Sequence, residues 1–304
     1  MPEPSGASGT RVVDEPLRRI GRNPSLGRGT WQSLTEVFEH RELLGRLVDR
    51  EVRAKYKNSS LGIVWSLMRP LAQLLIYYVA IGQFLGAARS IPDFAIFVFT
   101  GLTAWSLYSE ILTAGTNSIV SNSGLVKKVY VPREIFPLAA VGAAGFNFVV
   151  QFAILVIATV VLGQAPLHAD LLYLPLSVAL IFLFATALAL VLSALNVYLR
   201  DIQHLIEILL LVLFWASPIV YSMSFVHSAI GGTVLEEIYL ANPVTLGVLG
   251  MQKAMWISGS ADPTQFWPDL LWLRMLVAIV ICGILLVIGQ RIFSRLQSNF
   301  AQEL

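Results

Sequence analysis

Long apolar stretches with few or no charges run through most of the chain. A membrane-spanning helix needs roughly 20 predominantly apolar residues, and the sequence predicts six such helices. The uncharged run 135–169 continues almost directly into the run 171–199, and the turn signal Gly163-Gln164-Ala165-Pro166 divides the two. The predicted spans cover about 63–85, 94–116, 138–163, 171–197, 204–222 and 270–290.

The overall composition agrees with a chain that sits in a lipid bilayer. Of the 304 residues, 56% are apolar and only 13% are charged, and the mean hydropathy is +0.70. Soluble domains carry about 25% charged residues, so the composition excludes a soluble globular enzyme. The high apolar content and a net charge of only +2 also exclude a disordered chain. We therefore expect an all-α polytopic membrane protein.

Positive charges are concentrated on one side of the predicted spans. Of the 21 Lys and Arg residues, 18 lie in residues 1–60, in the loop 117–137, at Arg69 and Arg200, or in the tail 291–304. The three on the other side are Arg89, Lys253 and Arg274. Loops rich in Lys and Arg stay in the cytoplasm. An even number of spans then places both termini of this multi-pass membrane protein in the cytoplasm.

The predicted topology divides the chain into segments. Residues 1–30 are rich in Gly, Ser, Pro and Arg without a signal-peptide core, which predicts a flexible cytoplasmic tail. Residues 31–60 place apolar positions at helical spacing opposite a charged face, which predicts an amphipathic interface helix. That helix either lies in the membrane interface or packs as a soluble helix on the cytoplasmic ends of the spans. Residues 61–290 form the transmembrane domain with an outer loop at 223–269, and residues 291–304 form a second cytoplasmic tail.

The motifs of common catalytic and metal sites are missing from the sequence. It contains no G-x-x-x-x-G-K-[ST] phosphate loop, no H-E-x-x-H and no G-x-S-x-G. The four histidines are scattered, and the single cysteine, Cys282, cannot form an intrachain disulfide or a cysteine metal cluster. We therefore expect no catalytic residue, no metal and no cofactor in this chain, which would not itself be an enzyme.

Three charged residues fall within the predicted spans, where charges are costly and are candidates for function. Glu110 lies deep in the second span and needs a partner or water, so we expect it to face the bundle interior. Arg69 lies near the cytoplasmic end of the first span and can instead extend its side chain to the interface. Glu207, near the start of the fifth span, is either functional or simply interfacial. The three do not form the regular series of a proton relay.

Polar and aromatic residues recur at helical spacing in the first and fifth spans. Aromatic faces can stack on the apolar faces of sugar rings, and Gln and Tyr offer hydrogen bonds without a fixed charge. These stripes would therefore suit a conduit for a glycan. Alternatively, the aromatic residues belong to membrane-interface belts or to helix packing. The predicted channel-lining residues are Arg69, Gln73, Tyr77, Phe84, Glu110, Glu207, Phe214, Trp215 and Tyr221.

The predicted cytoplasmic loop 117–137 changes from polar to basic to apolar along its length, with Pro132 and Pro137 in its last part. Proline fixes the backbone where helices start or stop. A short, rigid and exposed segment of this kind is suited to docking into a groove on another protein, or it serves only as a basic anchor for the topology. Composition does not separate these two interpretations.

Three runs of sequence resemble those of a known family. Residues 122–137, NSGLVKKVYVPREIFP, resemble the signature of ABC-2-type permeases that export polysaccharides, a group that includes O-antigen and teichoic-acid exporters. Residues 50–65, REVRAKYKNSSLGIVW, resemble the entry of that family into its first span. Residues 196–202, NVYLRDI, resemble the segment after its fourth span. The resemblance covers about residues 30–300.

The resemblance implies an ABC-2 permease fold that forms a homodimer and pairs with two copies of a separate ATPase subunit, which would hold ATP and Mg. Residues 31–57 would correspond to the interface helix of the family, 122–135 to its coupling helix and 223–269 to re-entrant gate helices. Spans one and five would line a conduit along the dimer axis. The residues expected to contact the ATPase are Glu51, Tyr56, Lys127, Lys128, Val129, Tyr130, Pro132, Arg133 and Glu134.

The cargo that the family implies is a polysaccharide or a lipid-linked glycan, such as an O-antigen or a cell-wall galactan. Membrane lipid would be a further partner, and nucleic acid would not. An ABC-2 exporter of a drug or ion shares the fold and is the nearest alternative. A secondary carrier would require Glu110 and Glu207 to titrate during transport. A polytopic transferase or hydrolase would need convergent polar groups in one loop, and the longest outer loop has only four acidic residues.

Overall fold

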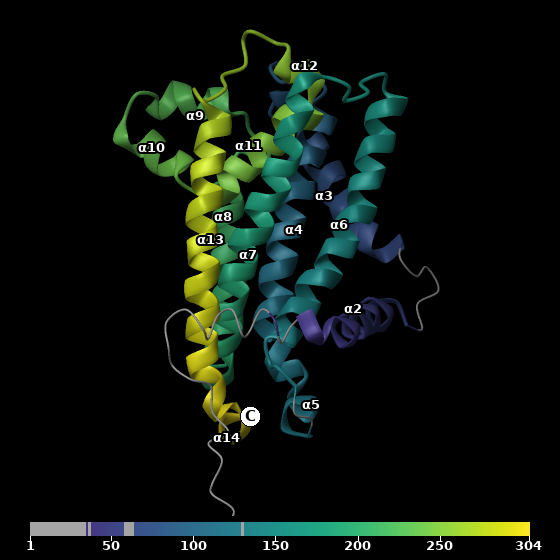
Figure 1. Cartoon of the computed structure of the whole chain (residues 1–304). Helices are drawn as coiled ribbons and strands as arrows, with labels where there is room; N and C mark the ends of the chain where they lie inside the picture. Colours follow the sequence, from purple (N-terminus) through teal and green to yellow (C-terminus); the bar gives the residue numbers. More distant parts are fainter. Residues whose placement is uncertain (1–34, 36–37, 58–63, 129–130) are drawn as a thin grey trace, which may run out of the picture.

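A computed structural model describes residues 35, 38–57, 64–128 and 131–304. The described residues form helices, turns and loops and contain no strand. The helices make an elongated bundle with two distinct ends (Figure 1). One end, called the α5 end below, carries α5 (Ser123–Lys128), α14 (Phe300–Glu303) and the C-terminus. The opposite end, called the α9 end, carries α9 (Met223–Ile230), α10 (Val234–Leu240) and α12 (Ile257–Ser260).

Among the described residues, four helical segments are long and apolar enough to cross a membrane. They are α4 (Phe94–Ser121), α6 (Ile135–Val161), α7 (Tyr173–Tyr198) with the preceding turn η3 (Ala169–Leu172), and α13 (Leu271–Leu296) with the following turn η4 (Gln297–Asn299). These segments cover the predicted second, third, fourth and sixth spans. Helix α4 continues five residues beyond the predicted end at 116, and α13 continues into the predicted tail.

The first predicted span is a composite helix. Helix α3 (Val64–Tyr77) has 14 residues and passes into a seven-residue π-helix, η1 (Tyr78–Phe84). A short 3-10 turn, η2 (Ala87–Arg89), follows. The π-helix packs closely on α4, because a Cβ atom on Gly82 would lie 2.8 Å from the ring of Phe94. Together the two helices have about the length that a bilayer requires.

The fifth predicted span is shorter than expected. Helix α8 (Ile202–Trp215) has 14 residues, which is about 21 Å of helix, against a hydrocarbon core of about 30 Å. It ends ahead of Pro218, since proline lacks an amide hydrogen and disfavours helical geometry in the preceding residue. Residues 217–220 then turn into the bundle, where all four are buried, and the Gln252 side chain donates a hydrogen bond of 2.8 Å to the Pro218 carbonyl.

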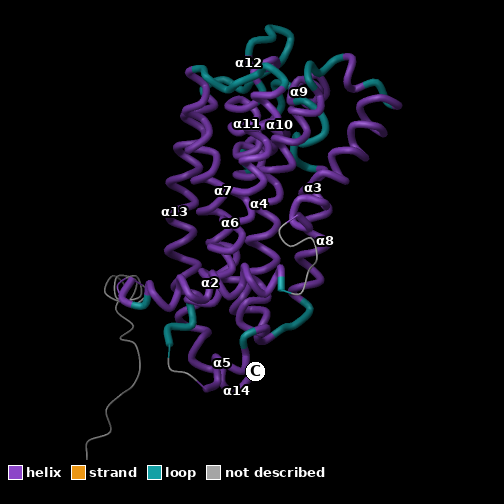
Figure 2. The backbone as a smooth tube through the Cα atoms, turned by 90° about the vertical axis from the view of Figure 1, so that its right-hand side faces the viewer, coloured by secondary structure: helices purple, strands orange, loops and turns teal. Residues whose placement is uncertain are grey.

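Helix α4 lies at the centre of the bundle and is largely buried by its neighbours. It packs on α6, α7 and the buried helix α11 (Pro243–Met255). Helices α3 and α8 pack on another side of α4 and lie near each other at the edge of the bundle (Figure 2). Because they have few neighbours within the chain, they keep one face exposed.

Helix α2 (Arg41–Tyr56) lies across the bundle near the α5 end (Figure 1). It packs on α6 through Leu47 and Val48, and a Cβ atom on Gly142 would lie only 2.7 Å from Val48. Leu47 belongs to a core at the α5 end that also includes side chains from α4, α5, α6, α7 and the C-terminal segment. The helical part of the predicted segment 31–60 is therefore anchored to the spanning helices, and most of residues 31–40 lie outside the described residues.

The loop predicted at 223–269 folds into four helices, α9 to α12. Asn242 begins α11, because its side chain accepts a hydrogen bond of 3.0 Å from the Val244 amide and Pro243 occupies the first turn. The chain therefore passes from α10 to α11 between Leu240 and Pro243. Helix α11 turns back into the bundle, where 11 of its 13 residues are buried.

Candidate conduit face and coupling segment

Aromatic residues from the first and fifth predicted spans meet on the α3 and α8 side of α4. The Tyr77 ring of α3 stacks on the Phe214 ring of α8 with centroids 5.6 Å apart, and it contacts Trp215 edge-on at 6.4 Å. Phe214 in turn contacts Trp105 of α4 at 5.5 Å. The structure thus brings together three of the residues that the sequence predicted to line a channel, namely Tyr77, Phe214 and Trp215.

The row of rings continues into α4 and α7. Trp105 lies 5.5 Å from Tyr108, and Tyr108 stacks on Phe184 at 5.9 Å with nearly parallel planes. We call Tyr77, Phe214, Trp105, Tyr108 and Phe184 the aromatic ladder. The sequence interpretation missed its α4 and α7 members, although Trp105 and Tyr108 are three residues apart in the second span and so share one helix face.

The surface beside the aromatic ladder is apolar and exposed. Of the other predicted lining residues in the first span, Gln73 of α3 is half-buried, Arg69 of α3 is exposed, and Phe84 of η1 is 82% exposed. The large apolar side chains exposed on α3, η1 and α8 are Met68, Leu71, Leu75, Ile76, Tyr78, Val79, Phe84, Leu205, Ile208, Leu209, Leu211, Val212 and Trp215. We call this surface the α3–α8 face.

Tyr221 lies where the chain leaves α8 for the α9 end. Its hydroxyl donates a hydrogen bond of 2.6 Å to the Trp215 carbonyl and lies 3.3 Å from the hydroxyl of Tyr239. The first contact satisfies a carbonyl at the C-terminus of α8, where helical partners are lacking. Tyr221 therefore ties the end of α8 to α10 at the end of the α3–α8 face.

Glu110 does not join this face. Its carboxylate Oε1 lies 2.5 Å from the Lys55 ammonium of α2 and 2.5 Å from the amide nitrogen of Asn147 in α6. Its side chain is 28% exposed. A carboxylate in a spanning helix needs a cation or hydrogen-bond donors, and here α2 supplies the cation. Glu110 was expected to face the bundle interior, and its partners Lys55 and Asn147 lie on the α2 and α6 side of α4.

Glu207 also lies apart from the aromatic ladder. Its side chain is 66% exposed on α8, and its Oε2 atom lies 3.8 Å from Nδ1 of His204 one turn earlier. Glu110 and Glu207 have separate partners on different helices, so the structure does not link the two residues that a secondary carrier would have to titrate.

The predicted ATPase contacts divide into outward-facing and inward-facing residues. Lys127 and Lys128 are exposed on α5, which projects from the α5 end (Figure 1). Val129 and Tyr130 lie outside the described residues. Pro132 is half-buried in the turn that follows. Of the predicted contacts on α5 and the following turn, the two lysines are therefore the described ones that face outward.

Arg133 and Glu134 face the C-terminal part of their own chain. The Arg133 guanidinium donates a hydrogen bond to the Gln297 carbonyl and lies 5.7 Å from the centre of the Phe300 ring. Glu134 is only 2% exposed, and its Oε1 atom accepts from the Ser294 hydroxyl at 3.3 Å and the Gln297 amide at 3.4 Å. We therefore assign both side chains to internal contacts of this turn rather than to a docking surface.

Helix α2 is joined to the same region through Arg50. Its guanidinium donates to Glu51 at 2.7 Å and to the side-chain oxygen of Asn122, which lies between α4 and α5. Glu51 is thus paired within α2. Tyr56 is the last residue of that helix. The sequence interpretation missed the link from Arg50 to Asn122, because the two residues are 72 positions apart.

Two carboxylates hold the helices at the α9 end. Glu236 of α10 is 6% exposed, accepts a hydrogen bond of 2.8 Å from the Gly232 amide and lies 2.7 Å from Nδ1 of His227 in α9. The hydrogen bond with His227 lowers the pKa of Glu236 below its usual range. Glu237 makes a two-pronged contact with the Arg274 guanidinium at 2.6 and 3.0 Å. That contact lowers the pKa of Glu237.

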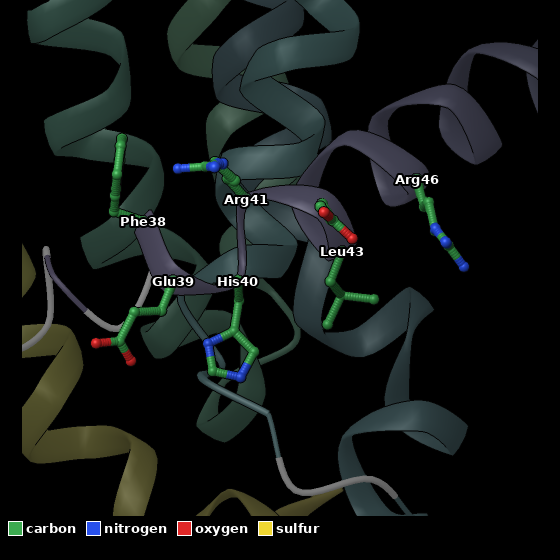
Figure 3. A pocket seen from close by; sticks show the side chains of 7 residues that line it. Phe38, Glu39, His40, Arg41, Leu43 and Arg46 are labelled. Atoms are coloured by element: carbon green, nitrogen blue, oxygen red, sulfur yellow. The ribbon is translucent and has the colours of Figure 1, made fainter.

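The described residues contain no group of three or more His, Cys, Asp and Glu side chains that could hold a metal ion. An open depression of about 650 Å³ lies around the start of α2 (Figure 3), and its lining mixes positive, negative and apolar side chains. Its lining residues are Phe38, Glu39, His40, Arg41, Glu42, Leu43 and Arg46.

The described residues form an all-helical bundle with four helices long and apolar enough to cross a membrane and with short helices at both ends. The chain belongs to the ABC-2 type transporter family, whose model matches residues 42–256. It is 32% identical over 192 residues, 63% of this chain and 73% of the relative, to the O-antigen export system permease protein RfbA of Myxococcus xanthus.

Two further similarities agree with this family. The O-antigen export system permease protein RfbA of Klebsiella pneumoniae is 25% identical over 262 residues, covering 86% of this chain and 94% of the relative. The polysialic acid transport protein KpsM of Escherichia coli is 24% identical over 180 residues, covering 57% of this chain and 67% of the relative.

Proposed function

We propose that this chain is the membrane-spanning permease subunit of an ABC transporter that exports a polysaccharide across the bacterial inner membrane. The observation that carries the proposal is its similarity to the O-antigen permease of Klebsiella pneumoniae over 86% of its length. The family match over residues 42–256 supports the same role. Because the sequence has no phosphate loop, a separate ATPase subunit supplies the energy in this proposal.

The proposed topology has six spans with both termini in the cytoplasm. The four long helices supply four spans, and α3 with η1 and the shorter α8 supply the other two. The α5 end then faces the cytoplasm, because Lys127, Lys128 and Arg133 lie there, whereas Arg89 and Lys253 lie at the α9 end. In this topology α2 lies along the inner surface of the membrane and α9 to α12 cover the outer end.

The proposed conduit lies on the α3–α8 face of a homodimer. A single copy leaves this face exposed beside the aromatic ladder, and a second copy related by a two-fold axis would bring two such faces together. Tyr77 and Trp215 then offer ring faces that can stack on sugars. The cargo of this proposal is a polysaccharide or lipid-linked glycan, as the names of the relatives suggest.

The proposed coupling contact with the ATPase is centred on α5. Lys127 and Lys128 are exposed there, and Val129 and Tyr130 follow directly in the sequence. Tyrosine is frequent among residues that dominate binding energy in interfaces. Glu51 and Tyr56 on α2, together with Pro132, are the remaining proposed contacts. ATP and Mg belong to the partner subunit in this proposal.

The proposal is tested in cells that lack this permease but make the glycan and the ATPase. Restoring the chain is expected to move the glycan to the outer side of the membrane, and the purified chain alone is expected to bind no ATP. A strain that exports the glycan equally well without the chain would contradict the proposal. Nucleotide binding by the isolated chain would contradict the proposal that a separate subunit binds ATP.

The α5 contact is tested by comparing Tyr130→Ala with Lys253→Ala, a change at the α9 end. Losing an interface hot spot costs at least about 2 kcal/mol, more than tenfold in affinity. Tyr130→Ala is therefore expected to reduce co-purification of the ATPase by about tenfold or more, and Lys253→Ala is expected to leave it unchanged. Equal recovery of the ATPase with both variants would show that α5 is only a topology anchor.

A further inference from the structure

The C-terminal segment Gln297–Leu304 folds back against the turn that precedes α6. The sequence predicted only a cytoplasmic tail for this region. Phe300 in α14 is fully buried, and its ring contacts Phe293 edge-on at 5.6 Å and Tyr198 at 6.2 Å. Phe300 is part of the core at the α5 end. Burial of a whole phenyl ring contributes roughly 1.5–3 kcal/mol, so the segment is held firmly.

Polar contacts join this segment to the turn directly. Arg133 donates a hydrogen bond to the Gln297 carbonyl, and its guanidinium lies above the Phe300 ring at 5.7 Å. Glu134 accepts hydrogen bonds from Ser294 and from the Gln297 amide. The segment therefore holds both charged side chains of the turn at once.

The same segment is also joined to two spanning helices. The Tyr198 hydroxyl, at the end of α7, donates a hydrogen bond of 2.6 Å to the Leu296 carbonyl, the last residue of α13. Helix α6 begins at Ile135, directly after the turn. A force applied to the turn can therefore reach α6 through the chain. It can reach α13 through the contact of Glu134 with Ser294, and α7 through Phe300, whose ring contacts Tyr198.

We propose that Gln297–Leu304 is a positioning element that clamps the Pro132–Glu134 turn to the ends of α7 and α13. This inference rests on the proposed function, in which an ATPase moves α5 during its cycle. With the clamp closed, movement of α5 shifts three spanning helices together. Without it, the turn bends and the movement is lost. Arginine suits this role, since its planar guanidinium stays charged and can donate a hydrogen bond while it covers an aromatic ring.

The test compares Phe300→Ala with Gln302→Ala, a matched change at an exposed position of the same helix. The complete transporter is reconstituted in vesicles, and the glycan exported per ATP hydrolysed is measured at equal amounts of permease. Phe300→Ala is expected to keep the ATPase bound and ATP hydrolysis active, but to lower this ratio about tenfold, which is the effect of losing one contact to a charged group. Gln302→Ala is expected to keep the wild-type ratio.

Two further variants keep the test decisive if Phe300→Ala does not accumulate. Phe300→Leu retains most of the apolar volume but removes the ring below the guanidinium, and is expected to lower the ratio by a smaller factor. Arg133→Ala combined with Phe300→Leu is expected to lower the ratio by less than the product of the two single effects, because the contact between the two side chains is lost in either single variant. A wild-type ratio in Phe300→Leu and in Arg133→Ala would overturn the clamp.

The outcomes also separate this inference from the proposed function. If the unchanged transporter exports no glycan in an ATP-dependent manner, the proposed function fails. If it exports glycan and the clamp variants export equally well per ATP, only the clamp is wrong.

Discussion

The two ends of the bundle are both held by charged side chains, but the chemistry of the two sets of contacts differs. At the α5 end, Arg133 contacts a backbone carbonyl and a ring face, and Lys55 neutralises Glu110. At the α9 end, the buried Glu236 is held by the imidazole of His227, and that hydrogen bond lowers the pKa of Glu236.

In the proposed topology the α5 end would lie in the cytoplasm and the α9 end on the outer side of the membrane. The comparison teaches that one bundle can hold one carboxylate, Glu110, with a lysine and another, Glu236, with a histidine. The predictions below run from the largest expected effect to the smallest.

The largest expected effect distinguishes the sides of the membrane on which the two ends lie. Ala261→Cys at the α9 end and Gly124→Cys at the α5 end both place a thiol at an exposed position, and a side chain at Gly124 meets open space. In a Cys282→Ala background, an impermeant thiol reagent is expected to label Ala261→Cys in intact cells. Gly124→Cys is expected to react only after the cells are opened. The reverse pattern would overturn the topology.

The next effect concerns the ion pair between Lys55 of α2 and Glu110 of α4. Lys55→Ala leaves the Glu110 carboxylate without its cation in a partly buried position. We expect a loss of about 1–2 kcal/mol in the free energy of unfolding, between the values typical of exposed and buried pairs. Denaturation of the solubilised chain measures this loss. The double change Lys55→Ala with Glu110→Gln is expected to recover much of it, and equal loss in both variants would show that the pair is not coupled.

A smaller effect is expected at the contact between Glu236 of α10 and His227 of α9. Because the folded pKa of Glu236 is lowered from its usual value of 4.5, ionised Glu236 stabilises the fold above about that pH. This stabilisation is lost as the pH falls through the lower folded pKa. Glu236→Gln should therefore lower Tm by about 3 °C at pH 7, the equivalent of about one hydrogen bond.

The Glu236→Gln variant also tests how this stabilisation depends on pH. The difference in Tm between the unchanged chain and Glu236→Gln should shrink as the pH falls from 4.5 through the lower folded pKa of Glu236, below which both side chains are neutral. Thermal unfolding followed from pH 3 to pH 7 measures this convergence. A difference that stays constant over that range would show that the charge on Glu236 does not contribute.

The smallest effect is expected for Glu237→Gln. Its contact with Arg274 is two-pronged, but the Glu237 side chain is 61% exposed. Exposed ion pairs contribute little and are screened by salt. The change in Tm should therefore be smaller than for Glu236→Gln and should disappear in 1 M salt. A larger loss than that of Glu236→Gln would show that Arg274, rather than His227, is the main support of α10.

The sequence alone identified the family, and the match over residues 42–256 confirms it. It also predicted an all-helical membrane protein, and the four long apolar helices agree with that. These features follow from local patterns: apolar runs of bilayer length set the long helices, and short runs such as 122–137 carry the family signature. The full count of six spans, the positions of the termini and the ATPase contacts stay predictions.

What only the tertiary structure decided is which residues lie together across long distances in the chain. Tyr77 meets Phe214 and Glu110 meets Lys55, yet helical periodicity in one segment says nothing of which face of another segment it contacts. Arg133 could be recognised from sequence as part of a distinctive turn, but not as a residue that faces inward, because its partner Gln297 lies 164 positions later. Short-range propensity and hydropathy determine where helices form. The packing of side chains between helices decides which charged side chains are paired within the chain and which remain exposed to a partner.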